Sequence, residues 1–468
     1  MNEIDIASAR GRRWDVILAG SSFASMFFLK TLPAGTSVLV VEKGVEHAHS
    51  EIIAGGLPQN DRYSQDNHDT HAKEWVSHTM FGGNSNCWWA CVPRFHPADF
   101  ALASRYGVGT DWPIGYDDLE RHYLQAERIM EVAGGGSDHI LPRSAPFPYP
   151  PHSPSRFDRA LRDASPDWFA QPCGRSNGGS RPPCCGNGSC MRCPIDSKFT
   201  IGNARDRFAR PDLFVLTGHE VRAVRLEAGT ATGVLVRGQD GETEIGGDTV
   251  ALGANATGNV VILERSGYSH PVLGRYLHEQ AGVAVIVDTD VDGYLGGTSI
   301  TGHGYELYDG AHRADHAAVL TEVWNSPPVL RPERGRWLQR MRLKFIAEDL
   351  PQARNRVSLG ADDRPHYEWF GHHRYSLDAL DNAVARLPEM LPMAVEAVTR
   401  GALNASEAHI QGTHRMGTDP AETVIDDTLR CHDVRNLFLL GAGAFPSCSP
   451  ANPTLTLAAL SLRAGETL

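Results

Sequence analysis

The sequence lacks any run of about 18 apolar residues, the length that a membrane-spanning helix requires. It is also poor in basic residues: 44 Lys and Arg stand against 56 Asp and Glu, which gives a net charge of −12. No cluster of Lys and Arg lines up on a predicted helix. These absences argue against a membrane span and against nucleic acid as a partner. The acidic balance would suit a cationic substrate or simply solubility.

A secretory signal is missing from the N-terminal pattern. The basic residues 10–13 run straight into a strand pattern, without the apolar segment and cleavage site of a signal peptide. We therefore expect a cytoplasmic protein whose nine cysteines serve as thiols or metal ligands rather than as disulfides. The 468 residues, with 47 Gly and 29 Pro, indicate a loop-rich globular chain of roughly three domain lengths.

The N-terminal 42 residues follow the order of a dinucleotide-binding unit. Residues 14–19 read as a buried strand, 20–25 as a tight turn of small residues, 23–32 as a helix and 37–41 as a second strand that ends in Glu42. Small residues allow the backbone to approach a pyrophosphate at the helix N-terminus, and the acid would hold ribose hydroxyls. Ser22 and Ser25 replace two glycines of the usual motif, so an ordinary buried βαβ unit stays the alternative.

Further elements are predicted along the chain. Residues 117–120 form a capping box that opens a helix to about residue 132, and a Gly/Pro-rich loop follows over 134–154. Short strands are expected at residues 221–226, 232–237, 242–245 and 249–252. The small-residue turn at 253–258 offers a second place where backbone could pass close to a cofactor.

His409 and Asn452 are the strongest candidates for chemistry. A histidine and an asparagine can act as a base and a hydrogen-bond donor on one substrate oxygen. Pro453 favours a helix start after Asn452, and the apolar run 454–462 predicts that this helix is buried. A buried helix N-terminus suits a developing anion. Taken singly, His409 could be a surface residue and Asn452 an ordinary helix N-cap.

Four ordered stretches resemble the glucose–methanol–choline family of FAD-dependent oxidoreductases, closest to the branch of pyranose oxidase and bacterial sugar dehydrogenases. They are the N-terminal unit, residues 81–89 (FGGNSNCWW) continuing to 93–95, the turn at Gly253, and residues 441–456 with His409. The resemblance spans nearly the whole chain, and residues 290–400 match least. It implies an α/β fold, with an FAD-binding Rossmann-like βαβ domain carrying a β-meander and a substrate lobe on an antiparallel sheet.

The resemblance also implies how the chain is divided. The expected segments are 1–110 (FAD-binding), 111–190 (lid and cysteine-rich insertion), 191–285 (FAD-binding), 286–405 (substrate domain) and 406–468 (FAD-binding and catalytic). His409 occupies the family's catalytic position before Gly-Thr, so His414 is interpreted as structural. The expected cofactor-binding residues are Gly20, Ser21, Ser22, Phe23, Ala24, Glu42, Gly82, Gly83, Asn84, Ser85, Asn86, Cys87, Ala254, Gly443, Pro453 and Thr454.

Cys87 departs from the family pattern. The pyranose oxidase relatives carry at the matching position a histidine that is covalently linked to the flavin. With a cysteine here, we expect the FAD to be non-covalent.

A second constellation gathers Cys184, Cys185, Cys190 and Cys193 within ten residues, with Pro194 after the last thiol. It resembles the iron–sulfur segment of FAD-dependent sugar dehydrogenases, although the last spacing is one residue shorter. Three interpretations stay open: an iron–sulfur cluster, a structural zinc, and free or paired thiols.

The leading expectation is therefore an FAD-dependent dehydrogenase that oxidises a hydroxyl of a sugar-like alcohol, an amino sugar included. Where the cysteines hold an iron–sulfur cluster, it would pass electrons through that cluster to an external acceptor such as an electron-acceptor protein. The rivals are an oxygen-using sugar oxidase that produces hydrogen peroxide and a non-catalytic electron-transfer flavoprotein. Loop 134–154 and residues 324–337 are expected to shape the substrate pocket.

Overall fold

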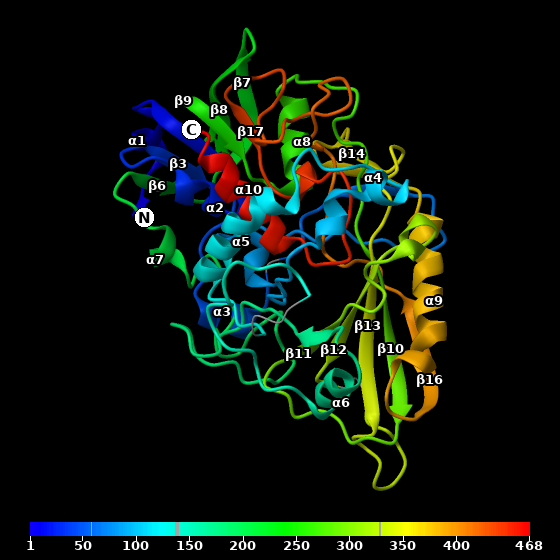
Figure 1. The fold of residues 1–468 in the computed structure, drawn as a ribbon. Coiled ribbons are helices and arrows are strands. Elements are labelled where there is room, and N and C mark those ends of the chain that lie inside the picture. The colour runs from blue at the N-terminus through cyan, green and yellow to red at the C-terminus, as the bar shows by residue number, and fades with distance from the viewer. Residues whose placement is uncertain (58, 136–139, 327–328) are drawn as a thin grey trace.

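The computed structural model describes residues 1–57, 59–135, 140–326 and 329–468. The chain builds two lobes, and both termini lie in the same one (Figure 1). Within the described residues, no helix combines the length and the apolar character needed to cross a bilayer.

The first lobe is built on an eight-stranded sheet in the order β1-β6-β3-β2-β9-β8-β7, with β17 paired to β9. The neighbouring strands β1, β6, β3, β2 and β9 run parallel, and β17 is parallel to β9. Strands β7, β8 and β9 form an antiparallel meander. The strand bounds are β1 (Asn2–Glu3), β2 (Trp14–Ala19), β3 (Val38–Val41), β6 (Leu213–Leu216), β7 (Glu220–Glu227), β8 (Thr230–Gly238), β9 (Gly241–Leu252) and β17 (Leu437–Leu439).

The predicted βαβ unit is present as β2, α2 (Phe23–Thr31) and β3. All four residues of β3 are buried, as the continuous apolar run of a central parallel strand requires. The separate strands expected at 242–245 and 249–252 are one strand, β9, because its first half pairs with the meander and its second half with β2. The Rossmann-like unit with a β-meander is confirmed.

Three helices cover this sheet near the site: α2, α10 (Thr454–Gly465) and α8 (Asn255–Arg265). Helix α5 (Tyr116–Met130) packs against α10, so this part of the expected lid belongs to the core of the first lobe. The expected capping box at 117–120 is misplaced, since α5 begins at Tyr116 and the Gly115 amide donates to Asp118 Oδ2 at 2.7 Å.

The second lobe is a six-stranded antiparallel sheet in the order β16-β10-β13-β12-β11-β5, with α9 (Arg374–Met390) packed against it (Figure 1). The antiparallel sheet of the substrate lobe is confirmed; its β10 begins at Ala281, before the expected boundary, and β5 comes from the expected insertion. The strand bounds are β5 (Trp168–Ala170), β10 (Ala281–Thr289), β11 (Ile300–Gly304), β12 (Val319–Trp324), β13 (Arg340–Ala347) and β16 (Val395–Leu403).

The remaining elements are short. A three-stranded sheet is formed by β14 (Arg356–Leu359), β15 (Pro365–Trp369) and β4 (Ser64–Asn67). The others are α1 (Ile6–Arg10), α3 (His49–Gly55), α4 (Leu102–Tyr106), α6 (Arg156–Ala164), α7 (Arg205–Phe208) and the 3-10 turns η1 (Gly83–Asn86), η2 (Pro97–Phe100), η3 (Ala311–Ala314) and η4 (Ala442–Ala444).

A buried polar network around Asp99 joins the two lobes. Asp99 lies in η2 and accepts hydrogen bonds from Tyr308 Oη (2.8 Å), Ser449 Oγ (2.8 Å) and Arg313 Nη2 (3.0 Å). Arg313 also donates to Glu348 Oε2 at 2.6 Å. A buried charge network of this kind tolerates little displacement, because separating the partners leaves uncompensated charge. The loop that contains Ser449 is thereby held between the lobes.

Candidate active site

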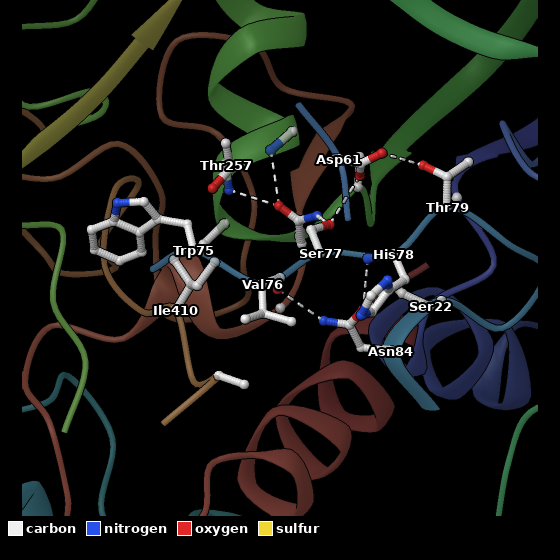
Figure 2. Close-up of a pocket in the computed structure, with 18 of the residues that line it drawn as sticks. Ser22, Asp61, Trp75, Val76, Ser77, His78, Thr79, Asn84, Thr257 and Ile410 are labelled. Carbon is white, nitrogen blue, oxygen red and sulfur yellow. Dashed lines mark hydrogen bonds between the residues drawn. The ribbon is translucent and has the colours of Figure 1, made fainter. Parts of the chain in front are cut away.

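A cavity of about 1180 Å³ is lined by residues of both lobes. It extends from the turn after β2 to His409 and Asn452, and continues to Glu322 and Lys344 on the second sheet. Its volume exceeds the roughly 300–1,000 Å³ of an ordinary ligand pocket, so it has room for a large cofactor together with a substrate. Figure 2 shows one wall, where residues 75–79 run past Asn84 and Asp61 is bonded to Ser77 and Thr79.

The turn after β2 gives the cavity a helix N-terminus. Gly20 has a φ of +89°, and a Cβ there would lie 3.0 Å from the carbonyl oxygen of Gly253. This glycine allows the first turn to touch the second small-residue turn. Ser22 caps α2, and its hydroxyl accepts the Ser25 amide at 3.4 Å. The cavity lining at this end includes the expected residues Gly20, Ser21, Ser22, Phe23, Ala24 and Ala254.

Glu42 faces the same end of the cavity and is held by three donors. Its Oε2 accepts the Ser21 amide (2.9 Å) and hydroxyl (2.6 Å), and its Oε1 accepts the Gly44 amide at 2.7 Å. Burial raises the pKa of this carboxyl, and the three hydrogen bonds oppose that shift. The carboxylate is therefore fixed in orientation beside the helix N-terminus, with lone pairs left for hydroxyl donors.

The loop at residues 82–87 contributes Gly82, Gly83, Asn84 and Cys87 to the cavity. Asn84 Oδ1 accepts the His78 amide at 3.0 Å, and Asn84 Nδ2 donates to the Val76 carbonyl at 3.2 Å (Figure 2). Asn84 thus fixes the neighbouring wall.

Ser85 and Asn86, expected at the cofactor, do not line the cavity. Ser85 Oγ accepts the Ile201 amide at 3.1 Å, and Asn86 Nδ2 donates to the carbonyls of Phe81 and Gly83, both at 2.9 Å. Their polar atoms are used inside the protein to fold the loop. A short polar motif cannot reveal which of its side chains turn inward.

Cys87 lies in the cavity wall, where its thiol donates to the Asn84 carbonyl at 3.4 Å. Burial raises the pKa of the Cys87 thiol to about 11. The group is therefore protonated at neutral pH, and a protonated thiol is a poor nucleophile.

His409 lines the cavity, and its ring is oriented by Gln280. The Nδ1 of His409 lies 2.8 Å from Gln280 Oε1. Gln280 Nε2 donates to the carbonyls of Ser449 (2.8 Å) and Ala451 (2.9 Å), so both amide hydrogens are engaged by oxygens. A flipped amide would bring its oxygen against two carbonyls; Oε1 therefore faces the imidazole and Nδ1 is the donor. The lone pair of the neutral ring is then on Nε2.

The surroundings of His409 keep it neutral. Burial lowers the pKa of His409 to about 4, although Glu407 and Glu279 nearby oppose that shift. The His409 amide donates to Glu279 Oε1 at 2.7 Å, and Glu279 is paired with the buried Lys73. The backbone and the ring of His409 are thus fixed by neighbouring residues of one stretch, Glu279 and Gln280.

Asn452 is buried in the cavity wall with its side chain uncommitted. It is 8% exposed, and its Oδ1 accepts no hydrogen bond from any described residue. Helix α10 is capped by Pro453, without a side-chain cap bond, so the ordinary N-cap role for Asn452 is not seen. Pro453 and Thr454 line the cavity as expected. A buried amide oxygen without a partner fits a site that a bound molecule completes.

His414 packs away from the cavity. It is fully buried, its Nδ1 lies 3.1 Å from Thr413 Oγ1, and burial lowers its pKa to about 3. Gly443 supports it, because a Cβ at this glycine would lie 2.0 Å from His414 Cε1. The interpretation of His414 as structural agrees with this packing, whereas Gly443, expected at the cofactor, lies outside the cavity lining and against the imidazole of His414.

The four cysteines of the predicted metal site have separate partners. Cys184 Sγ lies 3.5 Å from Thr298 Oγ1, Cys190 Sγ lies 2.7 Å from Ser299 Oγ, and Cys193 Sγ accepts the Ser197 amide at 3.2 Å. Cys185 is exposed. Across the described ranges, no group of three or more His, Cys, Asp or Glu is placed to hold a metal ion. The thiol arrangement does not fit a cluster.

Sequence reasoning missed several residues of the site, among them Gln280, which contacts His409 from outside the cavity lining. Gln280 had no signal, since its role depends on contacts with residues far along the chain. Trp324 was expected at the pocket and lines it, but Trp337 is 58% exposed and does not. Loop 134–154, of which residues 136–139 lie outside the described residues, contributes nothing to the cavity lining in its described parts. Ile300 on β11, Glu322 on β12 and Lys344 on β13 also line the cavity, together with Trp89 from the segment after η1 and Glu407 from the segment after β16.

Comparison with known proteins agrees with this geometry. Residues 351–461 match the family model described as GMC oxidoreductase. The fructose dehydrogenase large subunit of Gluconobacter japonicus is 25% identical, over 97% of this chain and 97% of its own. The 6'''-hydroxyparomomycin C oxidase of Streptomyces lividus is 26% identical, over 98% of this chain and 91% of its own.

The fold agrees as well. Pyridoxine 4-oxidase from Mesorbium loti superposes with a TM-score of 0.69 at 19% identity, covering 97% of this chain and 99% of that chain. The resemblance to the glucose–methanol–choline oxidoreductases is confirmed.

Proposed function

We propose that this chain is an FAD-dependent oxidoreductase that oxidises a hydroxyl group of a sugar-like alcohol to a carbonyl. One observation carries the proposal: a histidine with its lone pair on Nε2 and a buried amide whose oxygen accepts no hydrogen bond from the described residues line the same cavity as the small-residue turn after β2. The relatives' names, which mention fructose and 6'''-hydroxyparomomycin C, point to the same substrate class.

The residues present fit FAD. The α2 N-terminus and Gly20 would receive the pyrophosphate, and Glu42 would accept the ribose hydroxyls. Gly82 to Asn84 and the turn at Ala254 would flank the rest of the cofactor, with Pro453 and Thr454 at the flavin end. Bound flavin supplies an acceptor for the hydride that leaves the substrate carbon.

His409 would remove the hydroxyl proton. Its Nε2 takes the proton while the carbon loses a hydride, so that the alcohol loses two hydrogens and becomes a carbonyl. Asn452 would donate a hydrogen bond to the same oxygen and hold it against the base. The N-terminus of α10 adds positive potential where negative charge develops.

Gln280 would act as a positioning residue. Its amide orients the imidazole of His409 and bonds the two carbonyls immediately before Asn452. It thereby sets the distance between the base and the amide donor, a geometry to which rates are sensitive.

We propose that the flavin is non-covalent and that the enzyme is a dehydrogenase. The protonated Cys87 thiol supports the first point, because flavin attachment requires a thiolate. The full-length similarity to a dehydrogenase subunit supports the second. Since the cysteine segment does not fit a cluster, electron transfer from the flavin to an external acceptor is proposed without an iron–sulfur step.

Replacing the base tests the reaction itself. We expect His409→Ala to retain flavin and fold but to lose roughly 10²–10⁴-fold in the rate of flavin reduction by substrate, measured by anaerobic stopped-flow absorbance. His312→Ala, a partly buried histidine outside the cavity lining, is the control. Near-normal reduction in His409→Ala would sink the assignment of the base.

The acid limb of the pH profile tests Gln280. The rate of flavin reduction should be at its maximum above the pKa of His409, about 4. It should fall below that pH, because protonation of the imidazole removes the base. In Gln280→Glu a carboxylate faces Nδ1 and stabilises the imidazolium, so this limb should move to higher pH. Gln280→Ala should lower the rate constant of reduction more than substrate affinity. A profile unchanged in Gln280→Glu would contradict the positioning role.

Denaturation tests the flavin linkage. Acid precipitation should leave the yellow colour in the supernatant, because Cys87 forms no flavin bond. Cys87→Ser serves as the matched variant and should release the same amount of flavin. Colour retained by the wild-type pellet and absent from the Cys87→Ser pellet would establish a cysteinyl link instead.

The electron acceptor is decided by comparing oxidants. We expect faster reoxidation of reduced enzyme by an artificial dye acceptor than by oxygen, with little hydrogen peroxide. Iron and acid-labile sulfide, assayed on anaerobically purified protein, should be substoichiometric. Rapid peroxide formation would make the chain an oxidase, and stoichiometric iron and sulfide would restore the cluster at Cys184, Cys185, Cys190 and Cys193.

A further inference from the structure

A carboxylate on the second lobe has no role in the proposed reaction, although it lines the same cavity as His409. Glu322 lies on β12 and is 2% exposed. Its Oε2 accepts a hydrogen bond from Trp324 Nε1 at 3.1 Å. The nearest cationic candidate to its Oε1 is His303 Nε2 at 3.9 Å, beyond hydrogen-bond distance. The buried carboxylate of Glu322 thus lines the cavity with one neutral hydrogen-bond donor, the indole of Trp324.

The lysine opposite Glu322 is already engaged elsewhere. Lys344 on β13 is the cross-strand partner of Glu322, yet its ammonium is paired with Glu407. Asn404 Nδ2 donates to the other oxygen of Glu407 at 2.7 Å. All three ionisable side chains line the cavity, so this wall holds two carboxylates and one ammonium. The formal balance of these three side chains is one negative charge, and the Lys344 ammonium and the Arg342 guanidinium both act on Glu322 from the neighbouring strand β13.

Burying a carboxylate with a single neutral donor is unfavourable in free energy. A cation stabilises the buried charge more strongly than a hydroxyl does. Burial raises the pKa of Glu322, which shows that its charge is under-compensated. Trp89 and Trp324 stand beside it, with ring centroids 4.8 Å apart and planes inclined by 56°. Aromatic rings in a pocket suit the apolar side of a ring-shaped ligand, and the Arg342 guanidinium already lies over the Trp324 ring, 4.0 Å from its centroid.

We propose that Glu322 is a substrate-recognition residue that binds the ammonium group of an amino sugar whose hydroxyl is presented to His409. The inference rests on the proposed function, because it places the amine in the site where the alcohol is oxidised. An ammonium ligand would also compensate the negative charge of this wall, whereas a neutral polyol would not. Glu407, held by Lys344 and Asn404, keeps the lysine from neutralising Glu322.

The test compares sugars that differ only in one group. Glucose, 2-amino-2-deoxyglucose and 6-amino-6-deoxyglucose are measured by kcat/KM with a dye acceptor, and by their dissociation constants from titrated flavin absorbance. At least one amine should exceed glucose by about tenfold or more, as expected for a charge-assisted hydrogen bond in place of a neutral one. N-acetylation of that amine should abolish the advantage, because it keeps the nitrogen and removes the charge.

The variant Glu322→Gln keeps the shape of the side chain and should erase the preference for the amine, so that the ratio of kcat/KM for the amine to kcat/KM for glucose falls to about one. Glu306→Gln is the matched control, since Glu306 also accepts an indole N–H, from Trp168 at 3.0 Å, and lies outside the cavity lining. This control should retain the preference.

The outcomes separate the two proposals. Flavin reduced by sugars without any preference for an amine, or with a preference that survives Glu322→Gln, overturns the recognition role and leaves the proposed function standing. Flavin reduced by no alcohol overturns the proposed function, and the dissociation constants then decide whether Glu322 binds amines. If Glu322→Gln does not fold, the acetylated sugar decides the same question on the wild-type protein.

Discussion

The amide of Gln280 is the contact on which the geometry of the candidate site depends. It stands at the entrance to β10 and bonds His409 on one side and the carbonyls of Ser449 and Ala451 on the other. The loop it holds is also fixed by Asp99, which accepts from Ser449 and binds Arg313. Because every polar atom of the Gln280 amide is engaged, its orientation is determined, and the tautomer of His409 follows from it.

Desolvation has different consequences at neighbouring groups of this cavity. It lowers the pKa of His409, so that a base stays neutral, and it raises the pKa of Cys87, so that a thiol stays protonated. It also raises the pKa of Glu322, although the charges of Lys344 and Arg175 oppose that shift. In each case burial disfavours the charged form. The three groups differ in which hydrogen-bond and charged partners lie close to them, and that depends on the geometry of the fold.

The parts of the site that could be predicted from sequence are those built by adjacent residues. The strand, turn and helix around Gly20, and the helix start after Pro453, depend on local conformational preferences and apolar runs. Gln280 and Glu322 could not be found in this way, because their contacts join segments far apart in the chain. Three residues of the recognised motifs do not line the cavity: Ser85, Asn86 and Gly443. Their contacts are with Ile201, Phe81 and His414 inside the protein. The four cysteines are likewise close in the sequence, but their thiols do not come together in the structure.

The two lobes contribute different residues to the cavity, so the proposed recognition and the proposed chemistry depend on separate parts of the structure. The first lobe supplies the nucleotide turn and Asn452, whereas the second supplies Glu322 and Lys344 from adjacent antiparallel strands. On a strand, alternate side chains face opposite sides, so the register of β12 against β13 decides which charges enter the cavity. Under the proposed roles, a substitution on these strands would change the ligand that fits and leave the contact between His409 and Gln280 in place. His409 belongs to neither sheet and is held at the junction by Gln280, so it stays aligned with Asn452 whatever the second lobe selects.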